Sequence, residues 1–327
     1  MILNIQNLIQ ECKNASISAN GVNTKQAQFL MNIKDDELSF LTSVADDITR
    51  EVNGTNVDVE QLHNIKKNMC SEDCTFCGQS AFYNTGIDTY VLPPADEIVS
   101  RAMDARTQGS ESYCLVAAWR EPPLQDFKDV CDIIRRIIQE VGISVECSLG
   151  FLNKTQAETL YRIGVRRYNH NLETCRSMFP KICTTHTYDD RLKTLQIARK
   201  AGLELCTGGI IGMGESRQQR LELALDLSRI CPEEVTINIL VPMAGTPLQF
   251  QTHLNAKESA RMFAVLRFLL PHSIIKISGG REKAFDDDGA SLLRGGANGI
   301  ITAGYLTTGG NSPEKDSAMI KKAGLGQ

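Results

Sequence analysis

The sequence lacks any apolar run close to the ~20 residues that a membrane-spanning helix requires. It also lacks an excess of basic charge, since its net charge is −4, and nothing draws it toward nucleic acid or anionic membranes. Its first ten residues have no basic stretch followed by a long apolar core, so no signal peptide is expected. Low-complexity tracts and clear linkers are missing too, which favours a single domain. These absences predict a cytoplasmic protein with no membrane or nucleic acid among its partners.

Cysteine, in contrast, is plentiful: the chain has 11, and in a reducing compartment that number favours metal binding over disulfides. Three of them, Cys70, Cys74 and Cys77, lie within eight residues in the run CSEDCTFC. Three thiolates can bind three irons of a 4Fe–4S cluster and leave the fourth iron open to a small molecule. Structural zinc sites use paired C-x2-C units or histidines at finger spacing, and neither follows nearby. The run therefore predicts a 4Fe–4S cluster that takes part in chemistry.

From residue 64 onward, short β-rich runs alternate with longer amphipathic segments. The expected strands are 64–69, 113–118, 143–149, 166–172, 203–211, 235–241, 273–278 and 298–302. The expected helices include 96–108, 124–141, 189–201, 216–230, 256–269 and 285–293. Eight such repeats predict an α/β fold, a (β/α)8 TIM-type barrel that is fully closed or partly open. We expect residues 1–60 to form an N-terminal helical extension and residues 61–327 to form the barrel.

Active sites of such barrels gather at the carboxyl ends of the strands. Cys70 and Asn171 fall at or beside such ends, and Cys206 lies on a strand that leads to one. The glycine-rich segment 208–214 leaves a strand and enters a helix that Ser216 is expected to cap. Its glycine spacing does not fit a dinucleotide fingerprint, so we interpret it as a place where the backbone approaches a ligand closely.

The order and spacing of eight motifs resemble the biotin synthases of the radical S-adenosylmethionine (SAM) superfamily over about residues 60–310. The motifs are CSEDCTFCGQS (70–80), AAW (117–119), YNHNLET (168–174), TTHTY (184–188), CTGGIIGMGE (206–215), NILVP (238–242), GTPL (245–248) and GANGI (296–300). The resemblance implies that the open iron binds SAM and that one electron cleaves it to methionine and a 5′-deoxyadenosyl radical. That radical would abstract hydrogen from dethiobiotin, and two C–H bonds would become the C–S bonds of biotin. The resemblance also implies a homodimer and a flavodoxin or ferredoxin as electron donor.

The same resemblance assigns residues to SAM. Phe76 would lie against the adenine, with plain packing against the cluster as an equal alternative. Asn171 and Glu173 would bind the ribose hydroxyls, and Arg191 would pair with the SAM carboxylate unless it is an ordinary solvated arginine. The remaining implied SAM contacts are Ala117, Ala118 and Ile210.

Asparagines supply the expected substrate contacts. Asn169 and Asn171 alternate with His170, so on a strand both amides would face the barrel lumen. Asn238 lies inside another apolar run and would join them. Carboxamides can donate to and accept from the ureido ring of dethiobiotin, whereas the alternative is an internal amide network.

The chain departs from the usual family pattern at the auxiliary 2Fe–2S cluster, which three cysteines and an arginine hold and which supplies the sulfur. Cys114 and Cys206 occupy two expected ligand positions, but Glu146 occupies the third, next to Cys147, and Lys276 occupies that of the arginine. A one-residue shift on a strand turns the side chain to the opposite face, and a charged lysine does not bind metal. We therefore hypothesise a 4Fe–5S auxiliary cluster, with 2Fe–2S as the alternative. Its expected ligands are Cys114, Cys206, Cys183 and Cys147.

Two other interpretations compete with this one. Hydrogenase-maturation proteins and methylornithine-forming mutases share the cysteine triplet and the barrel, but they generally lack the YNHN run and strand-borne auxiliary cysteines. An iron–sulfur electron carrier without turnover explains the cysteines alone. It does not account for the lumen asparagines, for Arg191 or for the glycine-rich segment.

Overall fold

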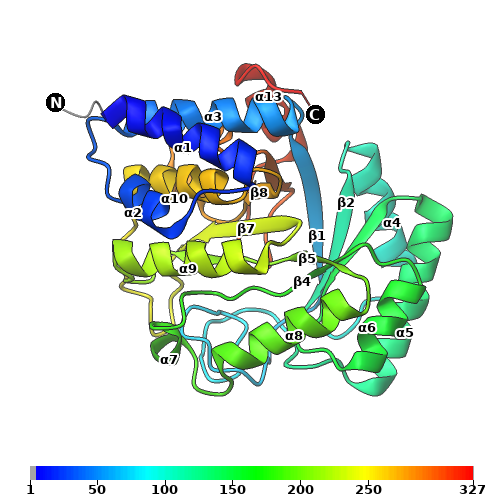
Figure 1. Cartoon of the computed structure of the whole chain (residues 1–327). Coiled ribbons are helices and arrows are strands. Elements are labelled where there is room, and N and C mark those ends of the chain that lie inside the picture. The colour runs from blue at the N-terminus through cyan, green and yellow to red at the C-terminus, as the bar shows by residue number, and fades with distance from the viewer. Residues whose placement is uncertain (1–4, 327) are drawn as a thin grey trace.

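A computed structural model describes residues 5–326 and places a closed parallel β-barrel at the centre of the molecule (Figure 1). The strands are β1 (Asp58–Lys66), β2 (Ser112–Ala117), β3 (Ser144–Ser148), β4 (Arg167–Asn169), β5 (Glu204–Cys206), β6 (Gly209–Ile211), β7 (Glu234–Ile239), β8 (Ile274–Ile277) and β9 (Gly299–Thr302). Strands β5 and β6 are two pieces of one barrel position, and both pair with β7, which closes the ring. The predicted (β/α)8 barrel is confirmed, and it is closed.

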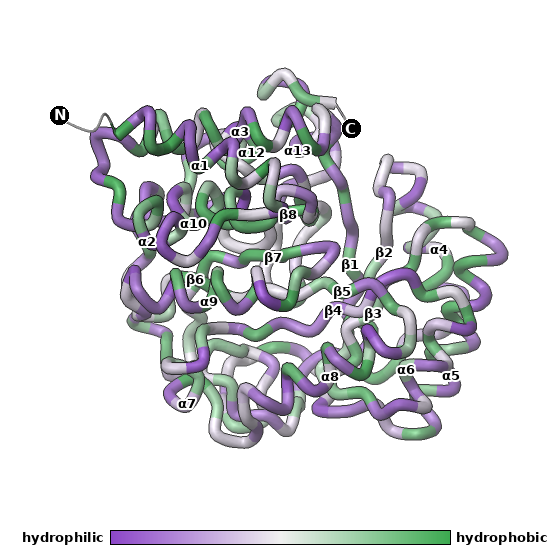
Figure 2. The backbone as a smooth tube through the Cα atoms, viewed as in Figure 1, coloured by the Kyte–Doolittle hydropathy of each residue, from purple (hydrophilic) through white to green (hydrophobic). Residues whose placement is uncertain are grey.

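Helices surround the barrel, and their residues alternate between hydrophobic and hydrophilic along the chain (Figure 2). They are α4 (Ala95–Thr107), α5 (Leu124–Arg136) with the π-helical turn η1 (Ile137–Val141), α6 (Lys154–Arg162), α7 (Phe179–Ile182), α8 (Tyr188–Lys200), α9 (Arg217–Ile230), α10 (Ala256–Leu269), α11 (Arg281–Ala284), α12 (Ala290–Leu293) and α13 (Pro313–Lys322). Ser216 caps α9 as expected, in a capping box with Gln219. Within residues 5–326, no helix combines the length and apolar character that crossing a bilayer would need.

Three helices precede the barrel: α1 (Ile5–Ala19), α2 (Thr24–Met31) and α3 (Leu38–Asn53). They lie over one side of the barrel, where α1, α2 and α3 all pack on α10 (Figure 1). Residues 1–4 of the predicted extension lie outside the described part of the chain. The division at residue 60 stays a prediction, although β1 already begins at Asp58, earlier than the expected 64–69.

Three other expected elements differ from the structure, and one is the expected helix 285–293, which is helical only over Ala290–Leu293. The expected strand 203–211 is interrupted at Thr207–Gly208, and the expected strand 166–172 keeps ladder pairing only over Arg167–Asn169. Steric contact explains the interruption of the strand, because a Cβ on Gly208 would lie 1.9 Å from the Thr236 carbonyl oxygen. A Cβ on Gly209 would lie 2.6 Å from the Glu173 carbonyl oxygen. These two glycines admit neighbouring backbone segments, and the approach of segment 208–214 to a ligand stays a prediction.

The strands separate an apolar outer face from a polar lumen. On β7, Val235 and Ile237 belong to the apolar core between barrel and helices, while Thr236 and Asn238 line the lumen. The same alternation places Cys114 of β2 inward and Leu115 outward. Lumens of such barrels are usually filled with branched apolar side chains. A polar lumen therefore needs internal partners or a ligand.

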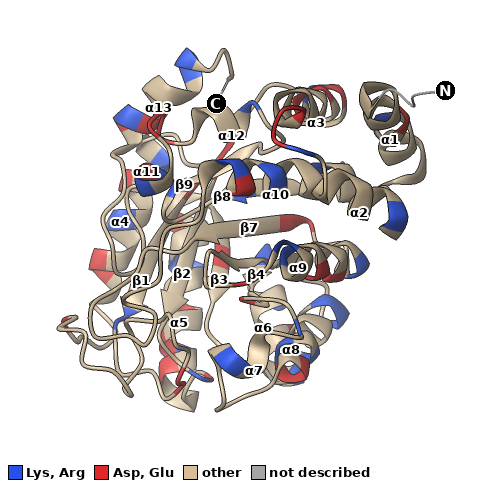
Figure 3. Ribbon diagram, turned by 90° about the vertical axis from the view of Figure 1, so that its left-hand side faces the viewer, with Lys and Arg blue, Asp and Glu red and all other residues tan. Residues whose placement is uncertain are grey.

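Charged residues of both signs are mixed on α9 and α10 (Figure 3). Glu258 of α10 joins the two helices through ion pairs with Arg217 and Arg220 of α9, the second at 2.5 Å, and with Arg261 at 3.3 Å. Partial burial by itself raises the pKa of Glu258, but the hydrogen bonds from Arg217 and Arg220 lower it from 4.5 to about 2. The ionised carboxylate thus stabilises the packing of these helices.

We predict that Glu258→Gln lowers the free energy of unfolding at neutral pH by about 2 kcal/mol. Because the folded pKa is depressed, this stabilisation is present above the unfolded value of 4.5 and is lost as the pH falls toward 2. Urea titrations of both proteins at several pH values should show the difference narrowing below pH 4.5. Glu158→Gln, at an exposed pair with Lys154, is the control and should change little. A difference that stays constant with pH would contradict the assignment.

Candidate functional site

A cavity of about 370 Å³ opens at the carboxyl ends of the strands. This size suits a small-molecule site. Fourteen of the sixteen predicted site residues line it: Cys70, Cys74, Phe76, Cys77, Cys114, Ala117, Ala118, Asn169, Asn171, Glu173, Arg191, Cys206, Ile210 and Asn238. The two that do not are Cys147 and Cys183.

The cysteine triplet lies in a loop that follows β1 and forms the wall of the cavity mouth. The loop folds back on itself, since the Cys70 amide donates to the Gln79 carbonyl at 2.9 Å and the Ala81 amide donates to the Cys70 carbonyl at 2.8 Å. In the described part of the chain, the sulfurs of Cys70, Cys74 and Cys77 do not all lie within 4.8 Å of one another. Sulfurs this far apart do not share a single ion, whereas in a cubane each thiolate binds a different iron. The residues present therefore fit the predicted 4Fe–4S cluster.

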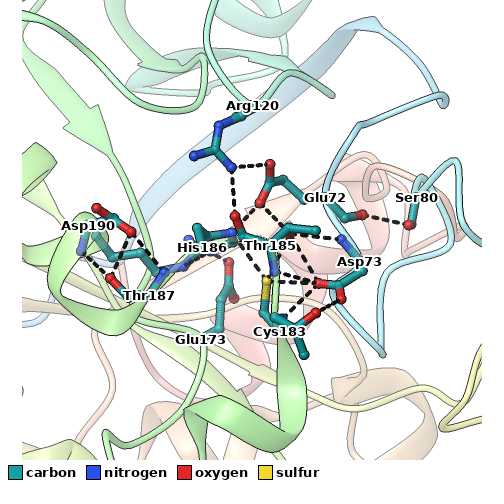
Figure 4. Close-up of polar contacts among 12 residues, drawn as sticks. Glu72, Asp73, Ser80, Arg120, Glu173, Cys183, Thr185, His186, Thr187 and Asp190 are labelled. Atoms are coloured by element: carbon teal, nitrogen blue, oxygen red, sulfur yellow. Dashed lines mark hydrogen bonds and ion pairs between the residues drawn. The ribbon is translucent and has the colours of Figure 1, made fainter.

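A polar network ties this loop to the segment after β4 (Figure 4). Glu72 pairs with Arg120 at 2.7 Å, accepts from the Thr185 hydroxyl at 2.6 Å and contacts His186. Asp73 accepts from the Thr184 amide at 2.9 Å, and these contacts hold the pKa of Asp73 well below its usual range. The two acids between Cys70 and Cys74 therefore fix the cluster loop in place.

Cys183 belongs to this network and not to the lumen. Its sulfur lies 3.2 Å from His186 Nδ1, and the sulfurs of Cys74 and Cys183 and a His186 nitrogen are within 4.8 Å of one another. The hydrogen bond with Cys74 lowers the pKa of Cys183 to about 4 and raises that of Cys74. The structure therefore does not bring Cys183 together with Cys114 and Cys206. This corrects its expected place in the auxiliary ligand set, because the loop returns to the cluster loop at the mouth.

Arg191 of α8 is held against the cavity wall by three groups. Its guanidinium donates to His186 Nε2 at 3.0 Å and to the Asn171 carbonyl at 2.8 Å, and pairs with Glu173 at 3.3 Å. Glu173 has a φ of 66°, a left-handed conformation that is strained for a glutamate. Burial raises the pKa of Glu173. Strain held by surrounding contacts is typical of ligand-binding positions.

The two lumen amides of β4 and β7 differ in how they are satisfied. Asn238 Oδ1 accepts from the Gly279 amide at 3.0 Å. Asn169 Nδ2 lies 3.5 Å from the Cys114 sulfur, while Asn169 Oδ1 is buried and accepts no hydrogen bond within the described part of the chain. A buried acceptor without a donor costs free energy, so the Asn169 carbonyl oxygen is suited to a ligand N–H.

Beside the Asn169 amide, two thiols lie at the floor of the lumen. Cys114 is in register with Glu146 of β3, and Cys206 with Glu234 of β7. Burial raises the pKa of both thiols well above the usual value. Cys147 is in register with Leu115 and lies in the apolar core outside the barrel. Cys147 therefore cannot join Cys114 as a ligand, which corrects that prediction through the strand alternation.

The floor also contains a network of buried charges around Lys276, whose partners the sequence did not indicate. Lys276 pairs with Asp58 at 2.9 Å, Glu60 at 2.6 Å and Glu234 at 2.8 Å. Burial alone would lower the pKa of Lys276, but these carboxylates raise it well above the usual value. Lys276 thus stays protonated and is no metal ligand, as expected.

Arg167 of β4 completes the floor. It pairs with Glu146 at 2.8 Å and Glu234 at 2.7 Å, and its other amino group pairs with Glu204 at 2.9 Å. A charged residue inside an otherwise apolar strand, such as Lys276 in Ile274–Ile277, was the signal in the sequence. Its partners depend on register between strands far apart in the chain, which the sequence does not give.

Comparisons with known proteins agree with this geometry. Residues 64–227 match the Radical SAM superfamily, and residues 236–326 match the Biotin and Thiamin Synthesis associated domain. The chain is 63% identical over 317 residues to a biotin synthase of Nitrosopumilus maritimus, covering 97% of each chain. It is 59% identical to one of Cenarchaeum symbiosum, covering 97% of this chain and 99% of that one.

Solved structures support the fold. Methylornithine synthase (PylB) superimposes with a TM-score of 0.84 at 17% identity, covering 96% of both chains. The hydrogenase maturase HydG does so with a TM-score of 0.83 at 16% identity, covering 98% of this chain and 74% of that one. At such identities the likeness concerns the barrel alone. The identities over nearly full length, the two matched domains and the cysteine loop together show that this chain belongs to the biotin synthase family of radical SAM enzymes.

Proposed function

We propose that the cavity binds dethiobiotin and converts it to biotin, with sulfur from an auxiliary cluster on the lumen floor. One observation carries the proposal: the buried carbonyl oxygen of Asn169 has no donor among the described residues, while the Nδ2 of the same amide lies 3.5 Å from the Cys114 sulfur. A ureido ring that donates to Asn169 would therefore lie next to the floor thiols. Asn171 and Asn238 line the same cavity and supply further amide contacts.

The cavity mouth is suited to SAM and its cluster. When bound, the 4Fe–4S cluster supplies an electron that cleaves SAM and so yields a radical able to abstract hydrogen from unactivated carbon. Cys70, Cys74 and Cys77 would hold this cluster. Arg191, oriented by His186, would pair with the SAM carboxylate. The other proposed SAM contacts are Phe76, Ala117, Ala118, Asn171, Glu173 and Ile210.

The type of auxiliary cluster is part of the proposal. Two floor thiols, Cys114 and Cys206, face the lumen, and Cys147 and Cys183 lie elsewhere. A site with two thiolates departs from the usual set of three cysteines and one arginine. This departure counts against the usual 2Fe–2S ligand set, and an iron count per chain separates 2Fe–2S from the hypothesised 4Fe–5S cluster.

The surroundings of the reaction are proposed by family resemblance. A flavodoxin or ferredoxin would deliver the electron, and the enzyme would act as a homodimer in the cytoplasm. An open iron site reacts with oxygen, so a working cluster requires low oxygen.

We predict that protein reconstituted anaerobically with iron and sulfide forms biotin and 5′-deoxyadenosine from SAM, dethiobiotin and a low-potential reductant. Mass spectrometry identifies both products. Cys74→Ala should abolish both, because it removes an iron ligand at the mouth. Cys231→Ala, at the exposed end of α9, is the matched cysteine control and should leave both unchanged. Deoxyadenosine without biotin would instead favour a sibling radical SAM enzyme, and neither product would favour an electron carrier.

We also predict that Asn169→Ala raises the KM for dethiobiotin roughly 10- to 100-fold, because the substrate would lose one buried hydrogen bond. Cleavage of SAM should continue, since the cluster loop is untouched. Steady-state assays that follow biotin and deoxyadenosine separately measure both effects. Asn14→Ala, on an exposed position of α1, serves as the control. An unchanged KM would argue against Asn169 as a substrate contact.

A further inference from the structure

Three fully buried glutamates from different strands converge on the lumen floor. Glu60 of β1, Glu146 of β3 and Glu234 of β7 each offer a carboxylate oxygen within 4.8 Å of the others. Carboxylates that are buried together repel one another and lose their hydration, so each needs a counterion or a proton. The three glutamates differ in how many of their carboxylate oxygens have a partner.

Glu234 is fully paired. Its Oε2 contacts Lys276 and Arg167, and its Oε1 accepts from the Thr236 hydroxyl at 3.2 Å. Glu60 and Glu146 are only half paired. Glu60 uses Oε2 for Lys276 and Glu146 uses Oε1 for Arg167, while Glu60 Oε1 and Glu146 Oε2 are buried and accept no hydrogen bond from any described residue.

With every group ionised, the charges on the floor do not balance either. Four carboxylates, those of Asp58, Glu60, Glu146 and Glu234, contact two cations, Lys276 and Arg167. Burial raises the pKa of Glu60 and of Glu146, so a proton on each carboxyl balances the charges; with both ionised, two negative charges are left over. A cationic group at the floor would balance them and would occupy the two free oxygens.

Two thiols share this floor with the free oxygens. Glu60 lines the cavity together with Cys114 and Cys206. Cys114 is in register with Glu146, so both side chains point inward at the same level of neighbouring strands. The two sulfurs and Glu60 thus line one cavity, and a carboxylate oxygen of Glu146 lies within 4.8 Å of one of Glu60.

We propose that Glu60 and Glu146 are ligands of the auxiliary iron–sulfur cluster, together with Cys114 and Cys206. The inference rests on the proposed function, because it names the residues that would hold its sulfur-donating cluster. Carboxylate oxygen is an established ligand of iron in proteins. Lys276 and Arg167, bonded to the other oxygen of each carboxylate, orient the two ligands from outside the cluster.

The test uses a parent variant in which Cys70, Cys74 and Cys77 are all replaced by alanine, so that the iron site at the mouth is removed. This parent variant is reconstituted with iron and sulfide. Iron and sulfide counts and the Mössbauer spectrum then report the floor alone, without turnover. The parent should bind about two irons or more per chain. Adding Glu146→Gln or Glu60→Gln should weaken iron binding at least about tenfold.

Glu204→Gln is the matched control, because Glu204 pairs with the same Arg167 but is 37% exposed on its side chain. It should leave the iron count unchanged, and so should Cys147→Ala. Glu146→Cys covers the case in which a glutamine variant fails to fold. It should retain iron, with Mössbauer parameters shifted toward those of thiolate-bound iron.

Several results would overturn the ligand assignment. They are a parent variant that binds no iron, glutamine variants that fold and bind iron as the parent does, and a Glu146→Cys spectrum identical to that of the parent. Iron binding that depends on Glu60 and Glu146 supports the assignment whatever the activity. If the enzyme with all its cysteines then makes no biotin, the proposed function fails and the ligand assignment stands.

Discussion

The pairing of buried charge in the barrel lumen is the interaction on which the rest of the structure depends. Lys276 and Arg167 are both almost completely buried, and each contacts carboxylates from other strands. Removing one partner from such a network leaves an uncompensated charge, which typically costs about 3–5 kcal/mol. The network therefore fixes which strands can be neighbours, since Glu234 contacts both cations. It also keeps the lumen polar where most such barrels are filled with apolar side chains.

The cysteine loop and the two lumen thiols lie at different places in the barrel, the loop at the mouth and the thiols at the floor. At the mouth, the cysteine loop is held by Glu72 and Asp73, which bind the segment 184–186. At the floor, Cys114 and Cys206 are surrounded by carboxylates. Asn169 lies beside Cys114 and lines the cavity that extends to the mouth. Under the proposed function, a substrate held by the Asn169 amide would lie between the site that generates the radical and the site that stores sulfur.

Much of this could be predicted from the sequence, because its signals are local. The spacing of Cys70, Cys74 and Cys77 indicates a cluster, and period-2 and helical patterns locate most strands and helices. Helix α10, expected at 256–269, has those bounds in the structure. Alternation on a strand also placed Asn169 in the lumen. These inferences need no knowledge of distant contacts.

The parts that sequence reasoning missed depend on pairing between distant segments. Cys183 follows a short helix, α7, and only the path of its loop shows that it meets Cys74. Cys147 is one residue from a lumen position, and register alone decides that it faces the apolar core. Glu60 and Glu234 lie more than 170 residues apart, yet both contact Lys276. No local pattern predicts such a contact.

The most direct test of the central claim follows the sulfur atom. The enzyme is reconstituted with isotopically heavy sulfide, separated from free sulfide, and given SAM, a reductant and unlabelled dethiobiotin for a single turnover. The account predicts that mass spectrometry finds the heavy isotope in the biotin formed, because the sulfur comes from a cluster on the lumen floor. Biotin that carries only light sulfur would contradict it.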